Sequence, residues 1–293
     1  MLNCCYYVLT ERCLVVTQNK KDLNDLHLAV LIDADNIPSS SIKGVMEEIA
    51  LYGTPTIKRI YGDWTSPNVQ AWKAPLLEHA ITPIQQYGYT TGKNATDSAM
   101  IIDAMDILYG GRTDGFVILS SDSDFTRLAI RLREAGQKVI GIGERKTPNA
   151  FIVACDKFIY IEVIRDHQKA QGGFFNFGLK KQKETTAKTK STIKPEKLHE
   201  VPVIPKETQY DMQNPESFIA ATIADIADED GYAFLGELGN LLLKKQPNFD
   251  PRNHGFAKLT PLLKSMPRFV IDVRQTKDAN IKHIYVKDSH AKN

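Results

Sequence analysis

The sequence predicts an α/β protein with a Rossmann-like, mostly parallel sheet, followed by a small C-terminal winged-helix domain. Apolar runs that suit strands alternate with helix-like segments from residue 27 to 165, as in βαβ units around a parallel sheet. The runs Leu28–Ile32 and Phe116–Leu119 are uninterrupted, which is typical of strands buried on both faces. Between 214 and 288, three helix-like segments precede two short strands, which is the element order of a winged helix.

Composition limits the number and class of domains. The chain has 293 residues, enough for about two domains. Its 42% hydrophobic and 25% charged residues are ordinary for a globular protein. We divide it into an N-terminal extension (1–26), a sheet domain (27–165), a flexible basic linker (166–213) and a winged-helix domain (214–288). Residues 165–206 hold 10 Lys or Arg against 4 Asp or Glu, so this tract either attracts nucleic acid phosphates or is a solvated linker.

Neither a membrane span nor a signal peptide is expected. No apolar run approaches the roughly 18 residues of a transmembrane helix, and Glu11 and Arg12 interrupt the mildly apolar start of the chain. The cysteines form no CxxC pair, so we expect free thiols in a reducing cytoplasm. A metal site on the N-terminal three is the alternative, although their spacing matches no common zinc pattern. The four are Cys4, Cys5, Cys13 and Cys155.

Glycine, serine and proline mark the boundaries of the sheet-domain elements. A serine run at 39–41 can cap the first helix, which Gly53 ends, and Gly136 ends a later helix. Pro75 lies inside the second helix and is expected to kink or split it. The predicted strands are 28–32, 55–61, 81–87, 116–119, 138–142 and 157–163, and the predicted helices are 42–52, 69–79, 95–109, 125–135 and 148–154.

The C-terminal elements follow a polar, proline-containing stretch in which regular periodicity is lost. Apolar residues recur at helical spacing after Pro215, and an alternating or apolar pattern near the end of the chain predicts two strands separated by a polar turn. The predicted helices are Phe218–Asp228, Glu237–Lys245 and Gly255–Met266, and the predicted strands are Phe269–Val273 and His283–Val286.

Carboxylates follow two of the predicted strands and open one helix. Asp33 ends the first strand, Asp122 and Asp124 follow the fourth, and Asp97 begins the helix that leads into the fourth. Ligands of open α/β sheets bind outside the carboxyl ends of the strands. Carboxylates gathered there repel one another, and a hard cation such as Mg²⁺ or Mn²⁺ relieves that repulsion. Such an ion activates water, so the pattern favours phosphodiester hydrolysis.

Each acid also has a purely structural interpretation. Asp124 and Asp97 are both placed to cap the helices that begin beside them, and Asp35-Asn36 is placed to form an Asx turn before Pro38. Ser120 and Ser121 are common turn residues. Two acid clusters at strand ends of one parallel sheet make the metal site the better joint explanation. Asp103 lies about 240° around its helix from Asp97 and is not expected to join them.

Three motifs occur in order along the first domain: LIDADN at Leu31–Asn36, KNATD at Lys93–Asp97 and SSDSDF at Ser120–Phe125. Residues 28–163 thereby resemble the NYN domain, a branch of the PIN-like nucleases, in its LabA-like form. The resemblance implies a Rossmannoid fold, a Mg²⁺ or Mn²⁺ site and ribonuclease activity. It departs from the usual pattern at Ser121, where glycine is common, and around Asn94, but no acid is lost. The implied catalytic and metal-ligating residues are Asp33, Asp97, Asp122 and Asp124, and the implied substrate-positioning residues are Asn36, Lys93, Ser120 and Ser121.

A second resemblance covers residues 215–287. The stretches Asp228–Tyr232, Leu235–Gly239 and Pro247–Arg252 resemble the OST-HTH, or LOTUS, domain. That family implies a winged helix associated with RNA binding and, in some members, with protein partners. The basic residues expected near phosphate are Arg252, His254, Lys258, Lys264 and Arg268, with solvated surface charge as the alternative.

We therefore expect a metal-dependent ribonuclease with an RNA-recruiting winged helix on a flexible tether, which would raise the local concentration of RNA at the nuclease domain. All four acids are present, which favours an active enzyme over a catalytically silent RNA-binding adaptor. A third interpretation is a protein-interaction module. The sequence leaves open the RNA target, DNA as a substrate, and the oligomeric state.

Overall fold

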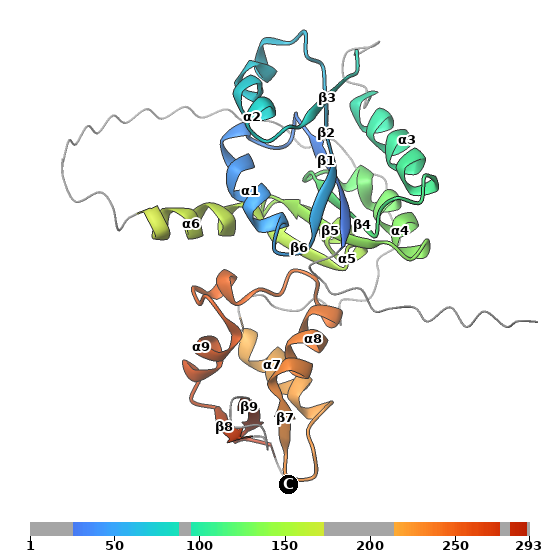
Figure 1. Cartoon of the computed structure of the whole chain (residues 1–293). Helices are drawn as coiled ribbons and strands as arrows, with labels where there is room; N and C mark the ends of the chain where they lie inside the picture. Colours follow the sequence, from blue (N-terminus) through green and yellow to red (C-terminus); the bar gives the residue numbers. More distant parts are fainter. Residues whose placement is uncertain (1–25, 88–94, 173–213, 276–281, 292–293) are drawn as a thin grey trace, which may run out of the picture.

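The computed structural model describes residues 26–87, 95–172, 214–275 and 282–291. The N-terminal cysteines, Lys93 and most of the expected linker lie outside these ranges. We call the first two ranges the sheet domain and the last two the C-terminal domain (Figure 1). Among the described residues, no helix is both long and apolar enough to cross a bilayer.

The sheet domain is built on six parallel strands in the order β3-β2-β1-β4-β5-β6. This agrees with the predicted Rossmann-like α/β class. The central strands β1 and β4 are buried along almost their whole length, as their apolar sequences require. The strands are β1 (His27–Asp33), β2 (Thr54–Gly62), β3 (Thr82–Gln85), β4 (Gly115–Leu119), β5 (Lys138–Gly143) and β6 (Lys157–Tyr160).

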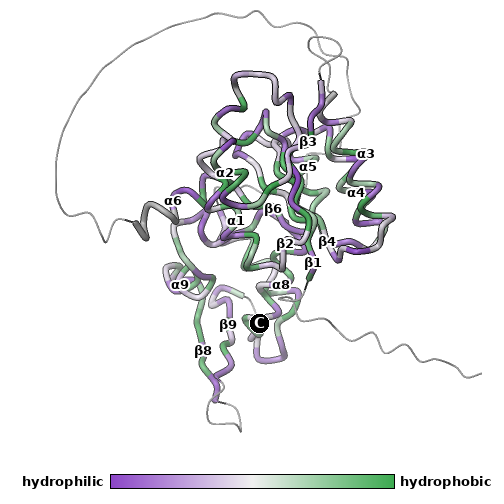
Figure 2. The backbone as a smooth tube through the Cα atoms, turned by 45° about the horizontal axis from the view of Figure 1, so that its top comes forward, coloured by the Kyte–Doolittle hydropathy of each residue, from purple (hydrophilic) through white to green (hydrophobic). Residues whose placement is uncertain are grey.

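Helices cover both faces of the sheet and form two hydrophobic cores (Figure 1). One core packs α3 (Ala95–Tyr109), α4 (Thr126–Glu134) and α5 (Asn149–Ala154) on one face. The other packs α1 (Ile42–Ile49) and α6 (Ile161–Gly172), with the region of α2 (Lys73–Glu78), on the opposite face. Figure 2 shows hydrophobic residues along the central strands, whereas the surrounding helices alternate hydrophobic and hydrophilic residues. Short 3-10 helices η2 (Ser39–Ser41), η3 (Pro67–Trp72) and η4 (Ser123–Phe125) complete the domain.

The predicted helix 69–79 is divided in the structure into the 3-10 helix η3 and the helix α2, and the division precedes Pro75, which lies inside α2. The end of the domain also differs from the prediction. The last strand was expected to run from 157 to 163, but β6 ends at Tyr160 and α6 begins at Ile161. The apolar run there is short, so periodicity does not separate strand from helix, and the buried pair Ile161 and Ile164 has helical spacing. Helix α6 continues to Gly172, seven residues into the range expected to be linker.

The C-terminal domain packs three α-helices against a small antiparallel sheet of order β7-β9-β8. The strand β7 was not predicted, because three residues give too little alternation to detect. The third helix was expected from Gly255, but Gly255 adopts a left-handed φ of 81° and the helix begins only at Leu259. The elements are α7 (Pro215–Ala224), β7 (Tyr232–Phe234), α8 (Leu235–Lys245), η6 (Pro251–His254), α9 (Leu259–Lys264), β8 (Phe269–Gln275) and β9 (Lys282–Asp288).

Candidate metal centre and nucleic-acid surfaces

The strand order reverses between β1 and β4, because the chain adds β2 and β3 on one side and then β4, β5 and β6 on the other. Crevices at such a switch point bind ligands in open α/β sheets. The register pairs Ile32 with Leu119, so the next residues, Asp33 and Ser120, leave the sheet side by side. The fold therefore brings the two strand-end motifs together at one place.

Asp33 is held in place by hydrogen bonds. It is only 1% exposed. Its Oδ2 accepts from the Asn36 amide at 2.6 Å and from the Ser120 hydroxyl at 2.9 Å, and its Oδ1 accepts from the Asp35 backbone amide at 3.1 Å. Burial raises the pKa of Asp33, and the three hydrogen bonds oppose that shift. Asp33 thus makes the Asx turn that the sequence had suggested for Asp35 and Asn36.

The other three expected ligands converge. Asp97, Asp122 and Asp124 each offer a carboxylate oxygen, and these oxygens all lie within 4.8 Å of one another. Asp97 comes from the first turn of α3, whereas the other two come from the turn after β4. The cap of η4 is Asp122, whose side chain accepts from the Asp124 amide at 2.9 Å. Capping uses one oxygen of Asp122, so the cap and a ligand role are compatible.

The electrostatics of Asp97 reflect this crowding. Its pKa is raised to about 6, first by burial and then by the negative charges of Asp33, Asp122 and Asp124. Asp33 is outside the converging group of three but close enough to act on the charge of Asp97. Repulsion of this kind is what a bound cation relieves.

The donor set fits Mg²⁺ or Mn²⁺. Oxygens that share an octahedral Mg²⁺ at about 2.1 Å are roughly 3–4 Å apart, and the three carboxylate oxygens, all within 4.8 Å of one another, are compatible with such a site. All candidate donors are carboxylate oxygens. Hard cations prefer such oxygens, whereas softer metals prefer sulfur or nitrogen ligands. The residues present therefore suit the ion that the sequence motifs imply.

Of the expected substrate-positioning residues, two hold Asp33 and one connects the turn after β4 to the end of β5. Asn36 and Ser120 both hold Asp33, and the Ser120 oxygen also accepts from the Asp122 amide at 3.1 Å. Ser121 is buried, and its hydroxyl accepts from the Glu144 amide at 2.9 Å, which ties the β4 turn to the end of β5. The two serines therefore fix the backbone of the turn that carries Asp122 and Asp124. Lys93 lies outside the described residues.

Sequence reasoning missed a polar cluster of three residues that joins α3 to β2. Asp103, on α3, accepts hydrogen bonds from Arg59 and from the hydroxyl of the buried Tyr61, both on β2. Asp103 thus anchors α3 to the sheet and stays out of the acid group, as its position around the helix predicted. No local sequence signal links Asp103 to residues more than 40 positions away.

The basic residues expected to meet RNA have unequal surroundings. Arg252 is bound by Glu48 and Asp250, and Arg268 makes two hydrogen bonds to Asp288 at 2.8 and 2.7 Å. Partial burial, and then the charge of Arg145, lower the pKa of His254. Lys258 and Lys264 make no ion pair with the described residues. The two lysines are therefore the members of this set that are available to phosphate.

The outer face of the small sheet carries aromatic and cationic side chains that sequence reasoning overlooked. The strand register places alternate residues of β7, β8 and β9 on this face. The Arg274 guanidinium lies 4.4 Å from the centre of the Tyr285 ring, and Phe234 is 39% exposed. Asp272 pairs with Arg274 on the same face. The period-two pattern was a usable signal; the outer face comprises Tyr232, Phe234, Val270, Asp272, Arg274, His283, Tyr285 and Lys287.

Two solved structures resemble part of this chain. A protein of unknown function from Vibrio parahaemolyticus is 18% identical, covers 48% of this chain and 96% of its own, and has a TM-score of 0.41. An uncharacterized protein from Nitrosomonas europaea is 30% identical, covers 35% of this chain and 96% of its own, and has a TM-score of 0.25. No curated protein matches the chain.

Family models identify both domains. The NYN domain model matches residues 27–162, which include all four acids, and the OST-HTH/LOTUS domain model matches residues 211–281. Both matches agree with the resemblances carried by the sequence motifs. The chain therefore contains an NYN domain followed by an OST-HTH/LOTUS domain, which together span most of its described length.

Proposed function

We propose that this protein is a metal-dependent ribonuclease whose centre is the acid cluster at the β1–β4 switch point. The observation that carries the proposal is the convergence of Asp97, Asp122 and Asp124 within 4.8 Å, from separate elements, in the place where open α/β sheets bind ligands. Asp33 stands beside them and raises the pKa of Asp97. Caps and turns alone do not require such convergence.

In this proposal Asp97, Asp122 and Asp124 hold the ion, and Asp33 completes the donor set. When bound, Mg²⁺ or Mn²⁺ supplies an activated water and neutralises charge that develops on the phosphate. An ionised carboxylate has about four acceptor positions. Asn36, Ser120 and the backbone amide of Asp35 occupy three of these positions on Asp33. One acceptor position on Oδ1 is left, and the three hydrogen bonds fix the direction in which it points. Asn36 and Ser120 therefore orient Asp33. The buried Ser120 also excludes bulk water from the side of the Asp33 carboxylate that faces the protein interior.

We propose that the C-terminal domain recruits the RNA. The OST-HTH/LOTUS match supports an RNA-related role. The outer face supports contact with unpaired bases, since aromatic rings and arginine planes stack on bases without sequence preference. Lys258 and Lys264 supply charge for the phosphates. A reducing cytoplasm remains our proposed location, with Cys155 as a buried free thiol.

The test is cleavage of labelled RNA by the full chain with Mn²⁺ or with EDTA. Single-stranded RNA, structured RNA and DNA of the same sequence distinguish the substrate class. Wild type is expected to cleave RNA with Mn²⁺ only, and Asp122→Asn is expected to lose at least about 100-fold in rate, since it removes a charge from the metal site. Asp106→Asn, an exposed acid on α3 outside the cluster, is the matched control and should keep wild-type activity. Equal rates for wild type and Asp122→Asn would refute the proposal, as would a wild type that cleaves no RNA.

A further inference from the structure

The C-terminal domain contacts the sheet domain along the open edge of the sheet. Strand β6 is the last in the sheet order, so among the described residues no strand lies beside one of its edges. The Phe158 amide on that strand donates to the Pro247 carbonyl at 2.9 Å, across a sequence separation of almost 90 residues. Open strand edges attract other chains and are usually covered. Here the segment that follows α8 covers the edge.

A second hydrogen bond continues this contact. The Asn248 amide donates to the Tyr160 hydroxyl at 2.8 Å, and both residues are buried. Tyr160 is two positions beyond Phe158 on β6, and Asn248 is next to Pro247, so this bond between two side chains lies close to the backbone bond. Asn248 is itself held, because its backbone carbonyl accepts from the Asn253 side chain at 2.9 Å.

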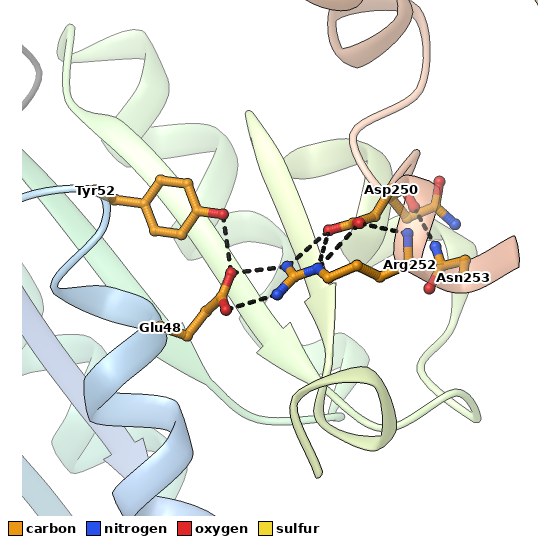
Figure 3. A network of polar contacts seen from close by, with 6 residues as sticks. Glu48, Tyr52, Asp250, Arg252 and Asn253 are labelled. Atoms are coloured by element: carbon orange, nitrogen blue, oxygen red, sulfur yellow. Dashed lines mark hydrogen bonds and ion pairs between the residues drawn. The ribbon is translucent and has the colours of Figure 1, made fainter. Parts of the chain in front are cut away.

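An ion pair fixes the other side of the contact (Figure 3). The Arg252 guanidinium donates to both oxygens of Glu48, each at 2.8 Å. Asp250 accepts from the same guanidinium at 2.8–3.1 Å, and the Tyr52 hydroxyl donates to Glu48 at 3.0 Å. The side chains of Arg252 and Glu48 are 17% and 8% exposed. The charged side chains of this cluster are all paired, because Arg252 pairs with both Glu48 and Asp250.

Such a cluster specifies one arrangement of the domains. A buried ion pair adds little net stability, because desolvation offsets the attraction, but leaving one partner buried and alone is costly. A shifted docking that kept Glu48 buried would leave its carboxylate without Arg252, whereas Arg252 would keep Asp250. The bidentate geometry adds directional selectivity. The hydrogen bonds at Phe158 and Tyr160 favour contact between the domains, and the Glu48–Arg252 ion pair selects one relative position.

We propose that residues 247–253 form a docking segment that binds the C-terminal domain to the sheet domain of the same chain. The Glu48–Arg252 ion pair fixes the docked position. Arg252 is then a structural residue of the interface instead of a phosphate contact. The domain is held in place instead of moving freely on a tether. This inference does not depend on nuclease activity.

The docked position also separates RNA recruitment from the acids. Glu48 is in the last turn of α1, which leads to the start of β2, whereas the acids follow the opposite ends of β1 and β4. Figure 1 shows the C-terminal domain beyond the end of the sheet that lies opposite α2 and β3. Seven residues of β1 at about 3.3 Å each put roughly 20 Å between the two ends. RNA held by the C-terminal domain would therefore reach the acids across a fixed span.

Amide hydrogen exchange at Phe158, followed by NMR on the full chain without RNA or metal, tests the docking directly. The Phe158 amide is protected in the proposed complex and exposed when the domains separate. We expect slow exchange in wild type and at least about tenfold faster exchange in Arg252→Ala and in Glu48→Gln, which changes only the sheet domain. Arg268→Ala removes an arginine paired inside the C-terminal domain and should leave Phe158 protected. Amides of Val117 and Leu242, in the two domain cores, report that each variant is folded.

The proposal is overturned if Phe158 exchanges freely in wild type, or if its protection survives both Arg252→Ala and Glu48→Gln while Val117 and Leu242 stay protected. Protection that disappears on dilution, together with a dimer in sedimentation, would also overturn it, because the docked domain would then come from a second copy. Failure of RNA cleavage leaves every one of these outcomes unchanged, so the two proposals fail separately.

Discussion

Asp97→Asn should stabilise the metal-free protein at neutral pH, which is the reverse of what most substitutions of a partly buried side chain do. The carboxylate sits among like charges, and its pKa is raised from 3.8 to about 6. A raised pKa means that the folded state holds the proton more tightly than the unfolded state. The metal-free protein therefore loses stability as pH rises from about 4 to about 6, and the loss is complete above 6. Asparagine carries no charge, so Asp97→Asn does not lose this stability as the pH rises.

The magnitude follows from the size of the pKa change. A rise from 3.8 to about 6 corresponds to roughly 3 kcal/mol at neutral pH if it were fully expressed. Asp97 is only partly buried, and solvent screens charges at such positions, so we expect about 1 kcal/mol. With Mn²⁺ the order should invert, because the ion stabilises wild type by mass action and Asp97→Asn binds it weakly.

Urea unfolding in EDTA and in Mn²⁺, followed by tryptophan fluorescence, measures this effect in the right domain. Both tryptophans of the chain, Trp64 and Trp72, belong to the NYN domain. Asp106→Asn serves as the control and should change stability by only a few tenths of a kcal/mol with an unaltered Mn²⁺ response. The reasoning fails if Asp97→Asn is less stable than wild type at pH 7.5 in EDTA, or if the difference between them is the same at pH 4.5.

Substitutions at three further positions probe other parts of the structure. Ser120→Ala should destabilise the NYN domain by about 1–3 kcal/mol in urea unfolding, because buried Asp33 loses a donor; an unchanged midpoint would contradict this. Tyr61→Phe removes a donor to Asp103 and should cost about 1 kcal/mol while Mn²⁺ affinity, measured by calorimetry, stays at the wild-type value. Tyr285→Ala should weaken binding of single-stranded RNA by about 10-fold or more in fluorescence anisotropy, whereas Tyr285→Phe keeps the ring and the affinity; equal loss in both would exclude stacking.

The order of strands and helices in the NYN domain was predictable because it rests on strong, local signals. Uninterrupted apolar runs such as Leu28–Ile32 fit only buried elements, and glycines end the helices. The boundaries at 157–164 were not predictable, since a short apolar run suits strand and helix equally. The break at Gly255 depends on one backbone angle, which residue type favours but does not dictate.

Three members of the acid cluster were predictable, but the place of Asp33 was not, because the structure brings Asp97, Asp122 and Asp124 together and leaves Asp33 outside that group. Strand ends and a helix start place Asp33, Asp97, Asp122 and Asp124 at one edge of a parallel sheet. Which of them is buried, and which caps η4, depends on side-chain orientation that spacing does not determine. The same limit applies to Arg252. An arginine near a helix start has the same sequence signature whether it meets phosphate or, as here, a carboxylate 204 residues away.

Calorimetric titration of the full chain with Mn²⁺, without RNA, tests most directly whether the strand-end carboxylates form one metal site. Wild type should bind Mn²⁺ at pH 7.5, and its affinity should fall as pH drops through about 6, where Asp97 takes up a proton that the ion must displace. Asp122→Asn should bind at least about tenfold more weakly. Equal affinity in wild type and Asp122→Asn, or no Mn²⁺ binding by wild type at pH 7.5, would contradict a metal site built on these carboxylates.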